Sequence, residues 1–229
     1  MIRLPATTTK LRRTLRQREV QAVLKHVPDN LFTEALEIGA GDGVQSQMIA
    51  RCAKAVVSTD LNDGRLERAP HPKINYQVCD CEVLPFENDR FDLVYSSNVF
   101  EHLLHPEAAL AEIHRVLQED GVVVNIIPNQ IWKLTHLALF YPNQALTAVE
   151  FLLSRRRRGL VGTHEGPGNN LAGERSSFIH RHLWPSVHGE NPNHLIEFVR
   201  MGASHWKQMF EQAGFRVAGR VNKLSFHSP

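Results

Sequence analysis

Closely spaced glycines after an apolar run form the segment of this 229-residue chain that most clearly predicts chemistry. In ALEIGAGDGV, residues 35–44, the apolar run ends at Ile38, and Gly39, Gly41 and Gly43 open the helix expected next. Glycine permits positive φ and lets backbone amides approach a ligand closely. The segment therefore predicts a small-molecule site at the end of a buried strand.

Two acids beside the glycines restrict the charge of that ligand. Glu37 precedes the turn and Asp42 lies inside it, so both would repel a pyrophosphate and attract a cation. A dinucleotide turn of the form G-x-G-x-x-G also needs a glycine at position 44, where this chain has Val44. The pattern disfavours a nicotinamide oxidoreductase and favours a ligand that carries positive charge.

Several motifs, in order along residues 30–127, resemble the class I S-adenosylmethionine-dependent methyltransferases. The first is ALEIGAGDG, and the second is the acid in VVSTDLN. The third is VCDCEVLPFENDRFDLVYSSNVFEHL, residues 78–103. One such acid alone could be an ordinary loop carboxylate, whereas the ordered set is specific to the family.

The resemblance implies that each motif contributes residues that bind S-adenosylmethionine. Glu37 would lie near the cationic methionyl end, with Gly39 and Gly41 beneath the cofactor. Asp60 would accept hydrogen bonds from both ribose hydroxyls, which suits a carboxylate. The other expected contacts are Leu61 beside that acid, Asp80 at the adenine amino group, the backbone amide of Cys81, and Ser97 and Asn98 near the middle of the cofactor.

A hydroxyl acceptor must also lose its proton, and histidine is the usual base near neutral pH. We expect His188, oriented by Glu190, to be this catalytic base, with His194 and His102 as alternatives. Each could instead be an ordinary surface or capping histidine. His180, His182, His188 and His194 could also bind a metal, but their spacing matches no standard zinc pattern, so we expect no metal.

Apolar runs alternating with helical patterns predict how these residues are positioned. The expected strands are 33–38, 55–60, 74–79, 91–96 and 122–127, with helices after position 43 and over 106–118. This order predicts an α/β fold, a Rossmann-like, doubly wound and mostly parallel sheet. A helix over 204–212 and a sixth strand over 215–221 should follow. Only eight residues come after position 221, so the family's last antiparallel strand is expected to be short or missing.

The alternation stops between residues 128 and 200. We interpret residues 1–229 as a single methyltransferase domain and 128–200 as an insertion in it that recognises the substrate. Residues 131–158 are apolar and end in four arginines, which fits either a lid over the site or peripheral contact with a membrane. Residues 1–25 are basic, and their apolar spacing predicts an amphipathic helix packed on the domain rather than a signal peptide.

Composition limits the remaining classes of protein. Apolar residues make up 42% and charged residues 22% of the chain, which is typical of a globular domain. The net charge of +2 is too balanced for a dedicated nucleic-acid binder, and no apolar run reaches the roughly 20 residues that span a membrane. Three unpaired-looking cysteines indicate a reducing, cytoplasmic setting, with contact at the inner face of the membrane as a further option.

These observations together predict an enzyme that transfers a methyl group from S-adenosylmethionine to a small-molecule or glycan acceptor. We expect O-methylation of a sugar hydroxyl on a glycan or glycolipid, because residues 194–215 resemble the tail of methyltransferases associated with bacterial surface polysaccharides. The alternatives are methylation of a lipid-like quinone or another small metabolite, and an inactive scaffold that only binds the cofactor. The sequence leaves the oligomeric state open.

Overall fold

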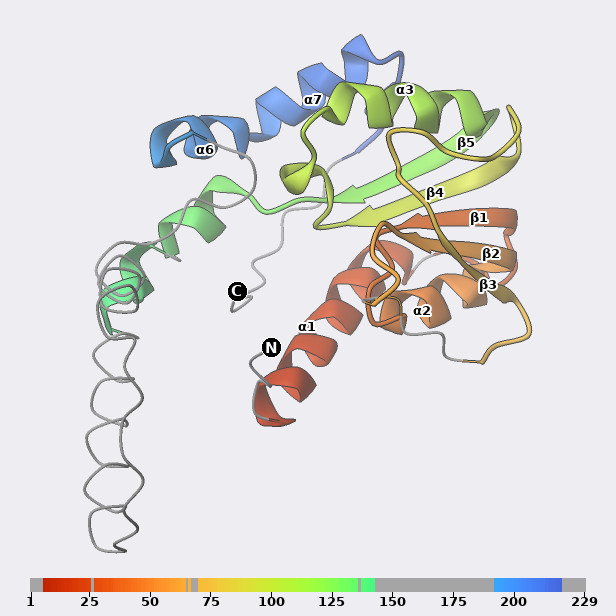
Figure 1. Ribbon diagram of the computed structural model, residues 1–229, viewed down its shortest axis with the longest axis horizontal. Coiled ribbons are helices and arrows are strands. Elements are labelled where there is room, and N and C mark those ends of the chain that lie inside the picture. The colour runs from red at the N-terminus through yellow and green to blue at the C-terminus, as the bar shows by residue number, and fades with distance from the viewer. Residues whose placement is uncertain are drawn as a thin grey trace, which may run out of the picture.

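The computed structural model describes residues 6–25, 27–64, 66, 70–135, 137–142 and 192–219, with side chains from residue 13. Its described strands form one sheet in the order β3-β2-β1-β4-β5, and every pairing is parallel. The strands are β1 (Phe32–Ile38), β2 (Ala53–Asp60), β3 (Ile74–Val78), β4 (Phe91–Ser97) and β5 (Leu117–Ile126). The predicted α/β architecture with a doubly wound parallel sheet is confirmed (Figure 1).

Helices cover both faces of the sheet because its central strands are apolar on both sides. Ala35, Leu93 and Tyr95 pack on α1 (Ala6–Leu24) and α2 (Val44–Cys52). The alternating residues Leu36 and Val94 point to the opposite face, which is covered by α3 (Pro106–Val116) and by α7 (Ala203–Gln212). Figure 1 shows the sheet between these two helical layers. Parallel strands that begin and end together place all their carboxyl ends at one edge.

The basic segment at the start of the chain forms α1 and belongs to the domain. Val20 and Leu24 are buried against Ile49 and Ala50 of α2, so the predicted packing of this helix is confirmed. Its exposed face carries Arg18. Burial of two apolar positions one turn apart fixes which side of α1 faces the domain.

The junction between α3 and β5 differs from the prediction of a helix to residue 118 and a strand from 122. The helix ends at Val116, because Leu117 turns extended and pairs with Phe91 at the start of β4. The ladder then resumes where Val122 pairs with Leu93. A Cβ on Gly121 would lie 2.6 Å from Leu117 Cγ, so glycine permits this tight irregularity.

Residues after β5 leave the sheet. Residues 130–135 and 137–142 are helical and lie beyond the carboxyl end of β5, beside α6 (His194–Arg200) (Figure 1). The first described part of the predicted insertion is therefore helical. Residues 143–191 lie outside the described residues, and with them the arginine run 155–158. No helix in the described part of the chain is long and apolar enough to cross a bilayer.

The predicted sixth strand is wrong for residues 215–219, which form no strand, whereas 220 and 221 lie outside the described residues. Gly214 takes a φ of 93° after α7, and Phe215 N–H donates to Phe210 O at 3.0 Å. This turn places the Phe215 ring on His114 of α3, with 5.3 Å between ring centres. The Phe215 side chain therefore packs the end of α7 against α3, and residues 216–219 are exposed.

Candidate functional site

The glycine turn lies between β1 and α2, where positive φ values at Gly39, Gly41 and Gly43 reverse the chain. Backbone N–H groups of Gly39 and Ala40 both donate to Thr59 O at 2.8 Å, which ties the turn to β2. A Cβ on Gly39 would lie 2.2 Å from Val99 Cγ2, so this glycine is needed for packing. A Cβ on Gly41 would have no neighbour within 4 Å, so the turn leaves open space there, as a cradle for a ligand requires.

Glu37 lies beneath this turn and is 1% exposed. Its Oε2 accepts hydrogen bonds from the hydroxyls of Ser46 and of Ser58, the latter at 2.8 Å. No described residue donates to its buried Oε1. The site therefore holds a buried carboxylate with half of its acceptor capacity unused, which suits a ligand that brings a cationic or N–H group.

Burial raises the pKa of Glu37 to about 7, and the nearby charges of Asp42 and Asp60 raise this pKa further, whereas the Ser46 and Ser58 hydroxyls lower it. A raised pKa means that folding favours the neutral acid. The ionisable carboxyl therefore contributes stability at acid pH that is lost as the pH rises from about 4.5 through about 7. A cationic ligand would reverse this preference, because it favours the carboxylate.

Asp60 closes β2 and connects it to the glycine turn. Its Oδ2 accepts from Gly41 N–H at 3.1 Å, and its Oδ1 accepts from Asn62 N–H at 3.0 Å. Each carboxylate oxygen keeps a lone pair for a further donor. The adjoining Leu61 is 70% exposed, which leaves an apolar surface next to the acid.

Asp80 and Cys81 follow β3 in a loop that α3 holds in place. Asp80 is exposed, and its Oδ1 accepts from Glu82 N–H at 2.9 Å. Cys81 is 8% exposed, and burial raises the pKa of its thiol to about 12. The buried thiol anchors the loop in the core, and the exposed carboxylate beside it can meet a ligand.

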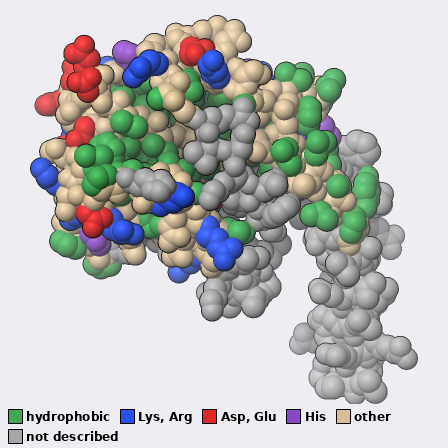
Figure 2. All heavy atoms as spheres, turned by 180° about the vertical axis from the view of Figure 1, so that it is seen from behind, with side chains coloured by type: hydrophobic (Ala, Val, Ile, Leu, Met, Phe, Trp, Pro, Cys, Tyr) green, Lys and Arg blue, Asp and Glu red, His purple; other side chains and the backbone are tan. Residues whose placement is uncertain are grey.

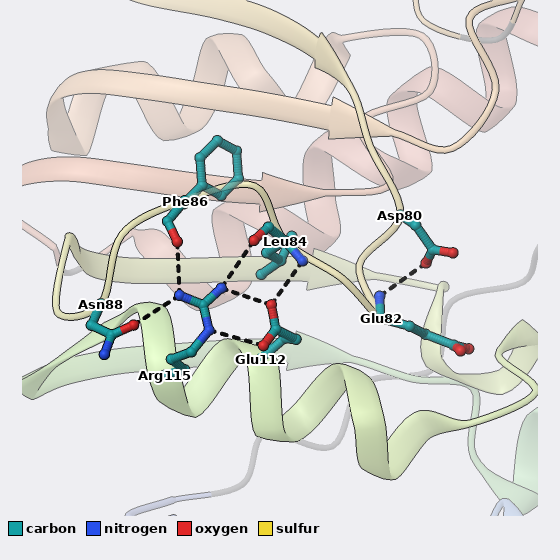
Figure 3. Close-up of polar contacts among 7 residues, drawn as sticks. All are labelled: Asp80, Glu82, Leu84, Phe86, Asn88, Glu112 and Arg115. Carbon is teal, nitrogen blue, oxygen red and sulfur yellow. Dashed lines mark hydrogen bonds and ion pairs between the residues drawn. The ribbon is translucent and has the colours of Figure 1, made fainter.

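The anchor for this loop is an ion pair on α3 that the sequence analysis missed. Arg115 Nη2 lies 2.7 Å from Glu112 Oε2, and the same guanidinium donates to the carbonyls of Leu84 and Phe86 at 2.9 and 2.7 Å. Glu112 Oε2 accepts in turn from Leu84 N–H at 2.8 Å. Figure 3 shows Arg115 in the middle of the loop, pointing at backbone oxygens on both sides of it. This pair positions the loop that carries Asp80.

Ser97 and Asn98 end β4 at the same edge of the sheet. Three side chains converge on Ser97 Oγ: Arg16 Nη1 at 2.8 Å, Asn98 Nδ2 at 2.9 Å and Gln45 Nε2 at 3.3 Å. Asn98 has a φ of 54°, a left-handed conformation in which asparagine is enriched, and its N–H donates to Ile126 O. Of these residues, Gln45 and Arg16 were not expected at the site.

Of the four predicted catalytic residues, the structure describes only His102 and His194. His188 and Glu190 lie outside the described residues. His102 is exposed at the end of a short 3₁₀ helix (Phe100–His102). His194 begins α6, and its Nδ1 lies 3.4 Å from Oε2 of Glu197, an acid that the prediction did not assign to the site.

Glu197 belongs to a buried charge cluster at the base of the predicted insertion. It is fully buried and pairs with the equally buried Lys133, whose Nζ lies 2.5 Å from Glu197 Oε2. This ion pair joins the helical residues after β5 to α6. Within the described part of the chain, no three histidine, cysteine or acidic side chains gather as metal ligands, which leaves the undescribed histidines untested.

One family model of known proteins spans the glycine turn and the acids Glu37, Asp60 and Asp80. Residues 36–125 match the family model described as a methyltransferase domain. The ubiquinone/menaquinone biosynthesis C-methyltransferase UbiE of Cupriavidus taiwanensis is 31% identical over 109 residues, which cover 44% of this chain and 45% of that protein. The demethylmenaquinone methyltransferase of Clavibacter sepedonicus is 32% identical over 94 residues, 39% of this chain and 38% of that protein.

Part of the chain also resembles solved structures. The S-adenosylmethionine-dependent methyltransferase of Mesorhizobium loti has 23% identity and a TM-score of 0.46, over 54% of this chain and 57% of that one. The chain spans less than half the length of the two curated relatives above.

The raised pKa of Glu37 predicts a pH dependence for cofactor binding. Below about pH 7 the free protein holds Glu37 partly protonated, so binding S-adenosylhomocysteine, whose ammonium favours the carboxylate, should release a proton. Affinity should rise with pH by up to about tenfold per unit below pH 7 and level off above it. Isothermal titration at pH 6 and pH 8 in buffers of different ionisation enthalpy measures both effects. Glu37→Gln should bind more weakly with no such rise, and an unchanged pH dependence in this variant would contradict the assignment.

Proposed function

Because residues 36–125 form a class I S-adenosylmethionine-dependent methyltransferase domain, we propose that the whole protein is an enzyme that transfers the cofactor's methyl group to an acceptor. The observation that carries the proposal is the buried Glu37, whose Oε1 is unused by the described residues, beside a glycine turn that leaves open space at Gly41. A pyrophosphate would be repelled by this carboxylate, whereas the methionyl end of S-adenosylmethionine brings positive charge.

The residues at the strand ends have separate tasks in this proposal. Glu37 balances the charge of the methionyl end, and Asp60 accepts from the two ribose hydroxyls while it holds the turn through Gly41 N–H. Asp80 accepts from the adenine amino group, with the loop held by Arg115. When bound, the sulfonium supplies an activated methyl group, so the protein chiefly has to align the acceptor with it.

The acceptor in this proposal carries a large apolar part. Exposed apolar side chains gather on residues 131–141 and on α6, and Figure 2 shows them on one side of the molecule. They are Ile131, Leu134, Leu139, Tyr141, Leu195, Ile196 and Val199, each at least 37% exposed. Such a patch marks a surface for a ligand or partner rather than for water. The two relatives are named as methyltransferases of quinone biosynthesis, which adds quinone-type acceptors to the candidates.

We place a lipid-like quinol first and the sugar hydroxyl of a glycolipid second. The names of the relatives and the apolar patch favour the quinol. The resemblance of residues 194–215 to glycan-associated enzymes favours the glycolipid. Both acceptors have a hydroxyl or an activated ring carbon beside an apolar tail. Contact with a membrane surface is consistent with either, since both would be drawn from lipid.

The ribose assignment predicts the effect of removing the Asp60 carboxylate. Asp60→Ala should weaken S-adenosylhomocysteine binding by about 1.5–3 kcal/mol, the usual contribution of charged hydrogen bonds. The matched control is Asp92→Ala, because the Asp92 carboxylate also accepts from backbone amides, those of Thr33 and Glu34, but at the opposite end of the strands. Titration calorimetry should find the control unchanged in affinity. Equal affinity in folded Asp60→Ala would place the ribose elsewhere.

The proposed acceptor predicts a ranking among substrates. With methyl-labelled S-adenosylmethionine, a short-chain prenyl hydroquinone should be methylated faster than octyl glucoside, and both faster than free glucose, because only the first two can use the apolar patch. Mass spectrometry of the product identifies the reacting atom. Turnover of free glucose at the rate of octyl glucoside would contradict an apolar acceptor, and no turnover of any acceptor with intact cofactor binding would favour an inactive binding protein.

We propose His194 as the base for a hydroxyl acceptor, because Glu197 lies within reach of its Nδ1. His194→Gln should then lower turnover by about 10²–10⁴-fold and leave cofactor affinity unchanged. His105→Gln, at an exposed histidine before α3, is the control. Normal turnover in His194→Gln would transfer the role to His188, with Glu190, or to His102, which the same assay then separates.

A further inference from the structure

Arg16 lies on α1, outside the residues that match the family model, and still reaches the candidate cofactor site. Its Nη1 donates to Ser97 Oγ at 2.8 Å and approaches Ser97 O at 3.5 Å, across 81 positions in sequence. Val20 and Leu24, farther along the same helix, are buried in the core, so the direction of Arg16 is fixed by packing. A long, flexible side chain is thus held at the carboxyl end of β4.

The hydroxyl of Ser97, which accepts from Arg16, has no further capacity to accept hydrogen bonds. A hydroxyl can accept from two donors and donate to one acceptor, and Ser97 Oγ already has Gln45 and Asn98 beside it in addition to Arg16. Arg16 uses only Nη1, and its remaining N–H groups donate to no described residue. The other N–H groups of this guanidinium therefore remain free for a ligand, and a guanidinium with two free N–H donors can recognise a carboxylate.

The charges around Arg16 also favour an anionic ligand group. The neighbouring Arg13, three residues earlier on the same helix face, is neutralised by Asp42 of the glycine turn, with Nε to Oδ2 at 3.4 Å. Arg16 has no such acid partner among the described residues. Its positive charge lies at the same strand ends as the negative charge of Glu37, so this end of the site offers one cationic and one anionic group.

We propose that Arg16 binds the α-carboxylate of the cofactor's methionyl group, while Glu37 faces its positive charge. The inference rests on the proposed function, and it makes α1 part of the cofactor site. An amino acid end group carries both charges a few ångströms apart, which the pair of Arg16 and Glu37 complements. A neutral or wholly cationic ligand would leave the guanidinium unused.

The test compares two ligands that differ in this end group. S-adenosylhomocysteine has the amino acid, whereas 5′-methylthioadenosine keeps the adenosine and the thioether without it. Arg16→Leu should weaken S-adenosylhomocysteine binding about 10- to 100-fold, as expected for a charged hydrogen bond, and change 5′-methylthioadenosine binding less than about twofold. Arg16→Lys should recover part of the loss, because it keeps the charge without the paired donors.

Arg18→Leu is the matched control, since Arg18 is exposed on the same helix and should change neither affinity. Melting temperatures of all variants establish that α1 still packs. If Arg16→Leu loses affinity equally for both ligands, or loses none for either, the inference is overturned. Binding of S-adenosylhomocysteine by the wild-type protein would still uphold the proposed function. Failure of the wild-type protein to bind S-adenosylhomocysteine would overturn both.

Discussion

A buried carboxylate needs two or more hydrogen-bond donors, and in this protein Glu37 receives them on one oxygen only. Burial of this carboxylate raises the pKa of Glu37 to about 7. The neighbouring elements of the site are positioned by this carboxylate, whose Oε2 has two donors and whose Oε1 has none among the described residues. The donors come from the first turn of α2 and from β2, so that carboxylate fixes how the two elements meet β1.

The glycine turn, Asp60 and α1 extend the same arrangement outward. Asp60 accepts from Gly41 N–H, so the acid expected to hold the ribose also shapes the turn above Glu37. Arg13 and Arg16 tie α1 to the turn and to the end of β4. The candidate cofactor site therefore includes α1, which precedes the residues that match the family model, and ligand binding at the glycine turn should also affect α1.

The strands along the chain, and the positions of three candidate acids near the strand ends, were predictable because both depend on local patterns. Apolar runs and the spacing of Glu37, Asp60 and Asp80 place each acid at a strand end whatever lies farther along the chain. Leu117 was misassigned because helix propensity continues past Val116, whereas pairing with Phe91, a distant residue, decides the boundary. Phe215 was misassigned for the same reason, since its contact with His114 outweighs its strand propensity.

The contacts missed altogether are long-range ones between polar side chains. Each of these contacts joins two segments that are far apart in sequence, and the residues around one partner do not indicate the other. The residues concerned are Arg16, Glu197 and Arg115. One signal was available: Arg13 and Arg16 are three residues apart on a helix whose other side is apolar, which points two cations at one place. The identity of that place required the fold.

A crystal structure of the protein with S-adenosylhomocysteine tests the central claim most directly. The account predicts the ribose at Asp60, adenine at Asp80, and the amino acid end between Glu37 and Arg16, with the ammonium toward Glu37 Oε1. Density for the ligand elsewhere, or with its amino acid end turned away from Glu37, would contradict the account.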